Sequence, residues 1–322
     1  MSPPQPLIIL KLNIMLNFTV AIPTYNGAAR LPDLLRKLQS QIHIENLTWQ
    51  ILVVDNNSKD HTAQVIKEFP NNFPGDCTIK YDFEEQQGAA FARQKAITLA
   101  KSDWVAFLDD DVIPANDWVI NAYQFSQKYP QAGAFGGQIH GNFEVDPPEN
   151  FHRIKSFLAI RERGEKPNLY DPDNLSLPPS AAWVVNRQAW LDNVPEEPTL
   201  GGRVKGSMVQ GDDYEPLLHM HRAGWKIWYN PTMHVHHQIP RQRLEKNYLI
   251  ALSRGCGLCV CKLRLINTKI WQKPIIITRI WLGNFKRLLL HLYKYRGQVK
   301  TDLVAACEME FLLGCLASPF YL

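Results

Sequence analysis

The sequence predicts an α/β protein built on a doubly wound, largely parallel sheet that is flanked by helices. Apolar runs of strand length at residues 18–22 and 51–54 are each followed by a polar turn and a segment with helical periodicity. A third apolar run, residues 105–108, ends abruptly in three consecutive aspartates. Strands that alternate with helices run parallel, and open parallel sheets bind ligands at their carboxyl edge. We therefore expect the functional side chains at that edge.

The other expected elements continue the alternation of helices and strands. Residues 146–179 are rich in proline and polar residues and lack periodicity, which indicates a long functional or mobile loop. The expected elements are helices at 31–38, 62–69 and 88–100, strands at 78–83, 134–139 and 181–187, a helix that ends at Ala223, and an edge strand at 225–231.

The aspartate run, Asp109, Asp110 and Asp111, indicates a cation site. Three adjacent carboxylates repel one another unless a cation lies among them, and a hard divalent metal suits oxygen ligands. Asp109 and Asp111 are two residues apart on extended backbone, so their side chains point to the same side. The alternative is that these acids cap the following helix.

A second acidic pair, Asp212 and Asp213, precedes a predicted helix, and the sequence His234-Val-His236-His237 follows the next strand. An aspartate at the start of a helix is most often a cap, so the pair also has a structural explanation. The histidines could belong to a zinc site, but such sites need a closed set of ligands, for which the distant cysteines are a weak supply.

Charge is distributed unevenly along the chain, although the net charge of 322 residues is only +4. Residues 241–300 contain fourteen lysines and arginines and one acidic residue, Glu245, among leucine, isoleucine and tryptophan. Such a basic amphipathic region suits an anionic membrane surface. The alternative is a helical appendage that packs on the core while its charges stay in water.

The six cysteines do not form a recognisable disulfide framework for a chain of this length, which favours a reducing compartment. We therefore expect a cytoplasmic protein, peripheral on the inner face of the plasma membrane if the basic region binds lipid. Cys256, Cys259 and Cys261 are crowded, but no fourth zinc ligand is evident nearby. Residues 1–16 have no signal-peptide cleavage site and are expected to be a poorly ordered leader.

Two common nucleotide-binding signatures are missing from the sequence. No G-x-G-x-x-G follows the first strand and no G-x-x-x-x-G-K-[ST] occurs, which argues against dinucleotide oxidoreductases and P-loop NTPases. A nucleotide at this edge would need Tyr25 for ring packing and Arg93 for phosphate or base. Asp55 and Asn57 could bind base or ribose, although each of these residues alone is more often structural: Asn57 or Asp60 could equally cap a helix, and Arg93 could be a solvated helix residue.

Six short motifs occur in an order that resembles family 2 glycosyltransferases of the GT-A fold. The resemblance covers roughly residues 17–240, which we expect to form the catalytic domain, with residues 241–322 as a basic amphipathic helical C-terminal region. More narrowly, the chain resembles glycosyltransferases of hormogonium polysaccharide biosynthesis. The motifs are PTYN at 23–26, VVDNNSKD at 53–60, Gly88 with Ala92-Arg93, LDDD at 108–111, GDDYE at 211–215, and Pro231 followed by His236.

The resemblance implies transfer of one sugar from a nucleotide-diphosphate-sugar donor to a hydroxyl of a glycan or lipid-linked acceptor, with inversion at the anomeric carbon. Mg²⁺ or Mn²⁺ on the D-x-D residues Asp109 and Asp111 would neutralise the diphosphate leaving group. Asp213 matches the catalytic base of the family. His236 is expected to help hold metal or diphosphate, with His237 as the adjacent alternative.

The same resemblance assigns a set of nucleotide-sugar contacts. The family commonly has Glu-Asp where this chain has Asp212-Asp213, which leaves the choice of base open. It often has smaller residues near Trp183, at the sugar pocket, which leaves the donor sugar open. The expected contacts are Pro23, Tyr25, Asn26, Asp55, Asn57, Arg93, Asp109, Asp110, Trp183 and Asp212.

Two alternatives to a transferase remain at the level of the sequence. One is a nucleic-acid-binding protein that uses the basic region, where aromatic residues interleave with the charges. It leaves the acidic sites unexplained, because acids repel phosphate, so we expect no nucleic-acid partner. The other is an inactive sugar-nucleotide-binding module.

The Gln-x-x-Arg-Trp motif of processive synthases is not matched at residues 238–242, which favours transfer of a single sugar.

Overall fold

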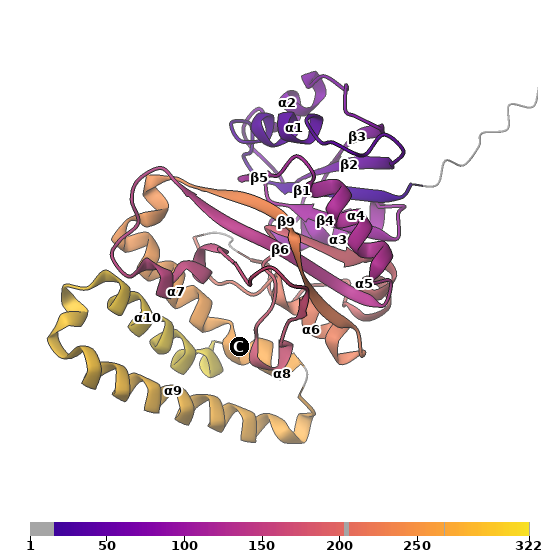
Figure 1. The fold of residues 1–322 in the computed structure, drawn as a ribbon. Helices are drawn as coiled ribbons and strands as arrows, with labels where there is room; N and C mark the ends of the chain where they lie inside the picture. The colour runs from indigo at the N-terminus through magenta and orange to yellow at the C-terminus, as the bar shows by residue number, and fades with distance from the viewer. Residues whose placement is uncertain (1–15, 203–205, 267, 322) are drawn as a thin grey trace, which may run out of the picture.

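The computed structural model describes residues 16–202, 206–266 and 268–321. The described strands form one mixed sheet in the order β3-β2-β1-β4-β8-β6-β9-β5, with β7 paired to β9 (Figure 1). The predicted α/β class is confirmed. The expected leader, residues 1–16, lies outside the described residues except for its last residue.

The N-terminal half of the sheet is parallel, as predicted. Here β1 (Phe18–Thr24) lies between β2 (Thr48–Asp55) and β4 (Trp104–Leu108), and β3 (Asp76–Phe83) pairs with β2. Residues 105–108 are fully buried because helices cover both faces of the strand. All the expected strand ends that carry polar residues therefore meet at one edge of the sheet.

Helices cover the two faces of this sheet and form two apolar cores. Leucines of α1 (Leu31–Gln39) pack with α2 (Thr62–Glu68) and α4 (Trp118–Lys128) on one face. The other face is covered by α3 (Ala89–Leu99), α5 (Arg187–Asn193) and α6 (Tyr214–Arg222). The helical periodicities read from the sequence match these faces.

The C-terminal half of the sheet is antiparallel in part, and here the sequence was less informative. β8 (Ala182–Asn186) runs antiparallel to β4 and to β6 (Ala132–Phe143). The expected edge strand at 225–231 is part of β9 (Lys226–Ile239), which pairs with β6 on one side and with β5 (Val112–Pro114) and β7 (Asn168–Leu169) on the other. The prediction of an edge strand was wrong. The strands β5 and β7, which pair with this side of β9, have three and two residues, too few to show a periodicity in the sequence.

The proline-rich segment is mostly irregular, as predicted. It contains only β7 and three short 3₁₀ turns at Phe151–Arg153, Lys155–Leu158 and Pro172–Asn174. Phe151, Ile154 and Leu158 are nonetheless buried against the C-terminal helices. The segment therefore connects the sheet to the helical layer.

The C-terminal region forms a helical layer below the sheet in Figure 1. Its helices are α7 (Lys246–Leu258), α8 (Val260–Ile266), α9 (Lys273–Tyr295) and α10 (Leu303–Ala317), with α10 between α7 and α9. Helices α7 and α10 cross closely at two glycines. A Cβ on Gly257 would lie 2.3 Å from the Phe311 carbonyl oxygen, and one on Gly314 would lie 2.5 Å from the Arg254 carbonyl oxygen.

Helix α10 is the apolar centre of this layer. Val304 and Cys307 pack against Leu249 and Leu252 of α7, and Glu308 forms an ion pair with Arg153. Among the described residues, Leu303–Phe320 is long and apolar enough, by length and composition alone, to cross a membrane, and 39% of that window is buried within the protein. Soluble core helices also meet this criterion.

Candidate active site

A cavity of about 360 Å³ lies at the carboxyl edge of the parallel strands. Its walls come from the end of β1, the residues after β4, the start of α3, residues 179–181, and the acidic pair before α6. The structure therefore brings the separate sequence motifs together, as expected for an open α/β sheet. The expected site residues that line this cavity are Pro23, Tyr25, Arg93, Asp109, Asp110, Asp111, Asp212 and Asp213.

The three consecutive aspartates have different surroundings. Asp109 has a carboxyl pKa raised to about 6, first because it is buried and second because the negative charge of Asp111 lies nearby. This electrostatic coupling agrees with the expectation that Asp109 and Asp111 point to the same side.

Asp110 is held by Arg30 and Thr24. The Arg30 Nε donates to Oδ1 at 2.8 Å and its Nη2 donates to Oδ2 at 2.9 Å, while Thr24 Oγ1 donates to Oδ2 at 2.5 Å. A bidentate ion pair of this kind fixes the carboxylate. Asp110 therefore joins the end of β4 to the turn after β1, and its remaining surface faces the cavity.

Asp111 lies beside His237 and Arg243. Arg243 Nη2 donates to Asp111 Oδ2 at 2.7 Å, and His237 Nε2 lies 3.5 Å from Asp111 Oδ1. Arg243 Nη1 lies 2.9 Å from His237 Nε2, and His237 Nδ1 lies 2.9 Å from the Leu158 carbonyl oxygen. Since Arg243 can only donate, His237 must accept at Nε2 and donate from Nδ1. This is the tautomer in which Nε2 can bind a metal.

Asp109, Asp111 and His237 have side chains of the types that bind divalent cations. Asp111 Oδ1 is buried and accepts no hydrogen bond within the described residues, which leaves one carboxylate oxygen available. Across the described ranges, no group of three or more histidine, cysteine, aspartate or glutamate side chains is arranged so that it could hold a metal ion by itself. Mg²⁺ characteristically uses one or two carboxylates and takes further oxygens from water and substrate phosphates. The residues present fit that kind of site.

His236 lies on the opposite face of β9 from His237. Its ring centroid is 5.3 Å from that of His140, which contacts His234 with 3.0 Å between Nε2 and Nδ1. Alternation along the strand explains the difference, since Val235 and His237 are buried on one face. The structure therefore places the alternative residue, His237, beside Asp111, while a metal-binding role of His236 stays a prediction.

The second acidic pair is attached to α3 through Arg93. Arg93 Nη1 donates to Asp212 Oδ2 at 2.8 Å, and its Nη2 donates to Ser180 Oγ at 2.8 Å. Among the described residues, Asp213 Oδ2 accepts a long hydrogen bond, 3.4 Å, from the Ser180 backbone N–H. Burial raises the pKa of Asp213 to about 7, and the charge of Asp212 adds to this rise against the opposing charge of Arg93. Two adjacent aspartates thus differ: one is paired and the other is free to exchange a proton.

Several predicted nucleotide contacts lie behind the cavity wall. Asp55 accepts from the Ser58 N–H at 2.9 Å and from the Tyr81 hydroxyl at 3.0 Å, so both of its carboxylate oxygens are engaged. Asn26 and Asn57 hold the neighbouring turns through hydrogen bonds with Lys59. These three residues shape the turns on which Pro23 and the 46% exposed ring of Tyr25 lie.

Trp183 also lies outside the lining of this cavity. Its side chain is fully buried in the second apolar core, with ring centroids 6.1 Å from both Phe107 and Trp190. Its expected contact with the donor sugar stays a prediction.

Some lining residues were not recognised in the sequence. Asn56 accepts the Gly88 N–H at 2.7 Å and so fixes the start of α3. Arg30 and Ser180 hold Asp110 and Arg93, and Arg243 pairs with Asp111. Asn56 lies within the VVDNNSKD motif. Arg243 lies five residues after Gln238, where the sequence was compared with the Gln-x-x-Arg-Trp motif, so both residues lie in or near segments that the sequence analysis considered. Arg30 and Ser180 had no distinguishing pattern.

The arrangement supports one kind of chemistry. The same cavity is lined by Asp109 and Asp111, which can bind a cation, and by Asp213, whose pKa suits a general base near neutral pH. Tyr25 also lines this cavity. These are the parts needed to remove a proton from a hydroxyl while an anionic leaving group is stabilised.

Comparisons with known proteins agree with this description. The model of the family described as "Glycosyl transferase family 2" matches residues 19–190. The uncharacterized glycosyltransferase YfnE of Bacillus subtilis is 31% identical over 152 residues, which are 45% of this chain and 38% of that protein. The succinoglycan biosynthesis protein ExoM of Rhizobium meliloti is 24% identical over 244 residues, which cover 74% of this chain and 72% of ExoM. The chain thus spans little more than a third of YfnE.

A solved structure shows the same fold. The mannosyltransferase PcManGT from Pyrobaculum calidifontis, solved with GDP-Man and Mn²⁺, has a TM-score of 0.60 and 17% sequence identity. The superposition covers 94% of this chain and 87% of the mannosyltransferase. It therefore includes the C-terminal helices, which lie beyond the residues that the family model matches.

Proposed function

The chain belongs to glycosyl transferase family 2 and is a glycosyltransferase; from that premise we propose that it moves one sugar from a nucleotide-diphosphate-sugar to a hydroxyl of a glycan or lipid-linked acceptor, with inversion. The observation that carries this proposal is the pairing, across one cavity, of Asp213 with the carboxylates of Asp109 and Asp111. Inversion needs a base and a leaving-group site on opposite sides of the sugar, and this cavity offers both.

Asp213 is the proposed general base. Its carboxylate is buried, accepts a long hydrogen bond from Ser180, and has a pKa raised to about 7, so it can take a proton from an acceptor hydroxyl near neutral pH. Asp212 is already paired with Arg93, which makes it the poorer base of the two. Arg93 therefore holds Asp212 in place, and Asp212 keeps the pKa of Asp213 high.

A divalent ion, Mg²⁺ or Mn²⁺, is proposed at Asp109, Asp111 and His237. When bound, it would supply positive charge that stabilises the diphosphate leaving group. Asp111 Oδ1 has no hydrogen-bond partner among the described residues, and His237 presents Nε2 towards Asp111. Arg243 pairs with Asp111 at the same place, so its guanidinium could add a charge-assisted hydrogen bond to a donor phosphate.

The nucleotide is proposed to lie over Pro23 and Tyr25, where the exposed tyrosine ring can pack against a base or ribose. Asp110 lines the same wall and is held rigidly by Arg30. Asp55, Asn26 and Asn57 would act by shaping the turns at the end of β1 and β2. PcManGT was solved with GDP-Man and Mn²⁺, which supports a nucleotide-sugar and a metal at the corresponding edge.

The proposed role is in polysaccharide or glycoconjugate biosynthesis, which the name of ExoM supports. Residues 17–240 would form the catalytic domain, with residues 241–322 as a helical region that completes it. A cytoplasmic location at the inner face of the plasma membrane fits an acceptor carried by lipid.

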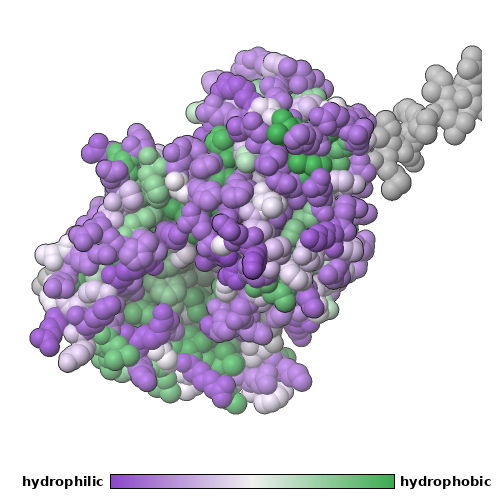
Figure 2. All heavy atoms as spheres, in the orientation of Figure 1, coloured by the Kyte–Doolittle hydropathy of each residue, from purple (hydrophilic) through white to green (hydrophobic). Residues whose placement is uncertain are grey.

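Helix α9 is the proposed contact with an anionic membrane surface. It has five lysines and arginines and no acidic residue over Lys273–Tyr295. Its apolar residues Leu282, Leu289 and Leu290 are 56%, 52% and 57% exposed. Figure 2 shows apolar residues gathered at the lower edge of the molecule, where Figure 1 places this helical layer. Each basic residue near such a surface contributes about 1 kcal/mol of binding.

The experiment that tests the transferase is a thermal-shift screen against UDP, GDP, dTDP and CMP, each with and without Mn²⁺. We expect one nucleotide to stabilise the protein only with metal, and this effect to disappear in Asp111→Asn. Slow hydrolysis of the matching nucleotide-sugar separates an enzyme from an inactive binding module. Stabilisation by single-stranded nucleic acid instead, with no nucleotide effect, would favour the nucleic-acid alternative and contradict the proposal.

A further inference from the structure

A second cavity, of about 460 Å³, lies on the far side of Asp213 from the first. The two cavities share Phe157, Ala159, Pro179, Gln210 and Asp213, so Asp213 lies at their junction. The outer walls of the second cavity come from α8, α9 and α10, which lie outside the residues matched by the family model. We call it the arginine cavity, for the residues described next.

Three arginines line the arginine cavity: Arg161, Arg264 and Arg287. Asp213 is the only acidic residue among those that line it. Their hydrogen bonds go to neutral groups: Arg161 to the Tyr214 hydroxyl at 3.2 Å, Arg264 to the Asp173 carbonyl oxygen at 3.2 Å, and Arg287 to Asn284 Oδ1 at 3.1 Å. Among the residues that the structure describes, none of the three forms an ion pair.

Arg161 and Arg264 are partly buried, whereas Arg287 is exposed. The Nε of Arg161 is buried and has no hydrogen-bond partner in the described part of the chain. Burial raises the pKa of the Cys315 thiol, and the positive charges of Arg287 and Arg264 both act to lower it. Three guanidinium groups around one cavity that Asp213 alone lines with a carboxylate repel one another, and an anionic ligand would relieve this repulsion.

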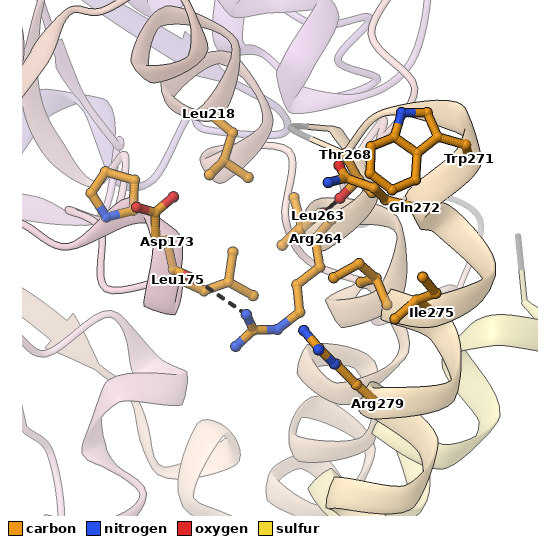
Figure 3. Close-up of a pocket in the computed structure, with 12 residues that line it drawn as sticks. Asp173, Leu175, Leu218, Leu263, Arg264, Thr268, Trp271, Gln272, Ile275 and Arg279 are labelled. Atoms are coloured by element: carbon orange, nitrogen blue, oxygen red, sulfur yellow. Dashed lines mark hydrogen bonds between the residues drawn. The ribbon is translucent and has the colours of Figure 1, made fainter.

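The arginine cavity continues outwards into a third cavity. This outer cavity, of about 420 Å³, shares Leu175, Leu263 and Arg264 with the arginine cavity. Figure 3 shows the side chains of Arg264 and Arg279 pointing into it, with Trp271 and Ile275 of the α9 side on its rim. Trp271 is 68% exposed, and the neighbouring Ile270 is 83% exposed. An apolar chain that leaves the arginine cavity would therefore pass onto the exposed apolar surface of α9.

We propose that the arginine cavity binds the phosphate or diphosphate group of a lipid-linked acceptor, held by Arg161, Arg264 and Arg287, with its lipid tail lying through the outer cavity along α9. The proposal rests on the transferase function and names the acceptor class for it. The first sugar of such an acceptor would extend from the phosphate towards Asp213, where its hydroxyl loses a proton. Arginine binds phosphate oxygens in bidentate fashion, which accounts for arginines rather than lysines at these three positions.

A binding titration tests this with the full chain and three probes: farnesyl diphosphate, farnesol and inorganic pyrophosphate. The buffer contains chelator, so that no metal can hold pyrophosphate at the aspartates. Farnesyl diphosphate is expected to bind at least tenfold more tightly than farnesol or pyrophosphate. Arg264→Gln and Arg287→Gln are each expected to weaken it at least tenfold, and Arg264→Lys less, because the lysine retains the charge.

The matched control is Arg36→Gln, because Arg36 is an exposed residue of α1 that pairs with Asp33 far from this cavity. Equal affinities in the control and in both cavity variants would overturn the proposal. Pyrophosphate binding as tightly as farnesyl diphosphate would overturn the lipid linkage, because the site would then recognise free phosphate.

This proposal and the transferase function can fail separately. The titration with farnesyl diphosphate needs no sugar donor. The thermal-shift screen with nucleotides depends only on the proposed donor site, formed by the aspartates and Tyr25. Arg287 is exposed on α9, so its substitution is not expected to unfold the chain. Unchanged metal-dependent nucleotide stabilisation in Arg287→Gln, together with the lost probe affinity, would assign the defect to the acceptor side.

Discussion

The two cavities that meet at Asp213 differ in charge and in the part of the chain that builds them. The first has the aspartates Asp109, Asp110 and Asp111 on its wall and is formed mainly by the sheet edge. The second has three arginines that form no ion pair with any residue the structure describes, and it is closed by helices that the family model does not include. If the arginine cavity binds the acceptor as proposed, this difference would separate a donor side at the sheet edge from an acceptor side in the C-terminal helical layer.

Replacing the residue shared by both cavities should have the largest effect. Asp213→Asn keeps the size of the side chain but removes its ability to accept a proton, so we expect kcat to fall by about 10³-fold. Affinity for donor nucleotide should stay within twofold, because no donor phosphate needs Asp213. Steady-state kinetics and nucleotide titration measure the two effects, with Asp192→Asn, an exposed residue of α5, as the control. A loss of only a fewfold would move the base to Asp212.

The next largest effect is expected on the donor side alone. Asp111→Asn removes a negative oxygen at the proposed cation site, and we expect kcat/KM to fall by about 10²-fold or more. The variant should also lose the part of nucleotide stabilisation that depends on Mn²⁺, which thermal shift measures. Farnesyl diphosphate affinity should be unchanged, because the arginine cavity lies beyond Asp213. Asp33→Asn, an exposed change on α1, serves as the control.

Local patterns made the donor side largely predictable. The apolar run 105–108 and the two strands before it have clear periodicity, so the sheet edge and the position of Asp109 followed from the sequence. The arginine cavity could not be predicted, because Arg161, Arg264 and Arg287 come from three separate segments and each has an ordinary local context. Likewise, the fully buried Trp183 shows that a position assigned through the family resemblance does not decide whether a side chain faces the cavity.

His236 and His237 give a sharper test of the same edge, because they are neighbours on opposite faces of β9. His237→Gln should weaken metal-dependent nucleotide binding by about 10–100-fold, since His237 contacts both Arg243 and Asp111. His236→Gln should change it by less than twofold, because His236 packs against His140 instead. Titration of the nucleotide identified by the screen, at fixed Mn²⁺, measures both. The reverse result would restore His236 as the metal residue.

The helical layer can be perturbed without touching either cavity's charged residues. Gly257→Ala places a Cβ 2.3 Å from the Phe311 carbonyl oxygen and should destabilise the α7–α10 contact by about 1–3 kcal/mol. Gly283→Ala is the matched control, because a Cβ there has nothing within 4 Å, and helix propensity should make it neutral or slightly stabilising. Denaturant unfolding measures both. Equal stability of the two variants would show that the close helix crossing is not required.

The smallest expected effect is on the pH dependence of the free energy of unfolding, and it follows from the raised pKa of Asp213. The pKa of this carboxyl is raised from 3.8 to about 7 in the folded chain, so the folded state holds a proton that the unfolded state releases. Its contribution to stability is present below about pH 4 and is lost as pH rises through about 7. Asp213→Asn, which stays neutral, should therefore gain about 1–3 kcal/mol relative to the wild type between these limits, or roughly 2–4 °C in Tm.

The gain in Tm should be larger at pH 8 than at pH 5, in chelator, where no metal contributes. If the variant were equally stabilised at both pH values, the gain would come from packing and not from an ionised, buried carboxylate. A larger gain at pH 8, combined with lost turnover, would mean that the chain holds Asp213 charged at the expense of its own stability. That combination is expected of a general base and not of a helix cap, since removing a cap lowers stability.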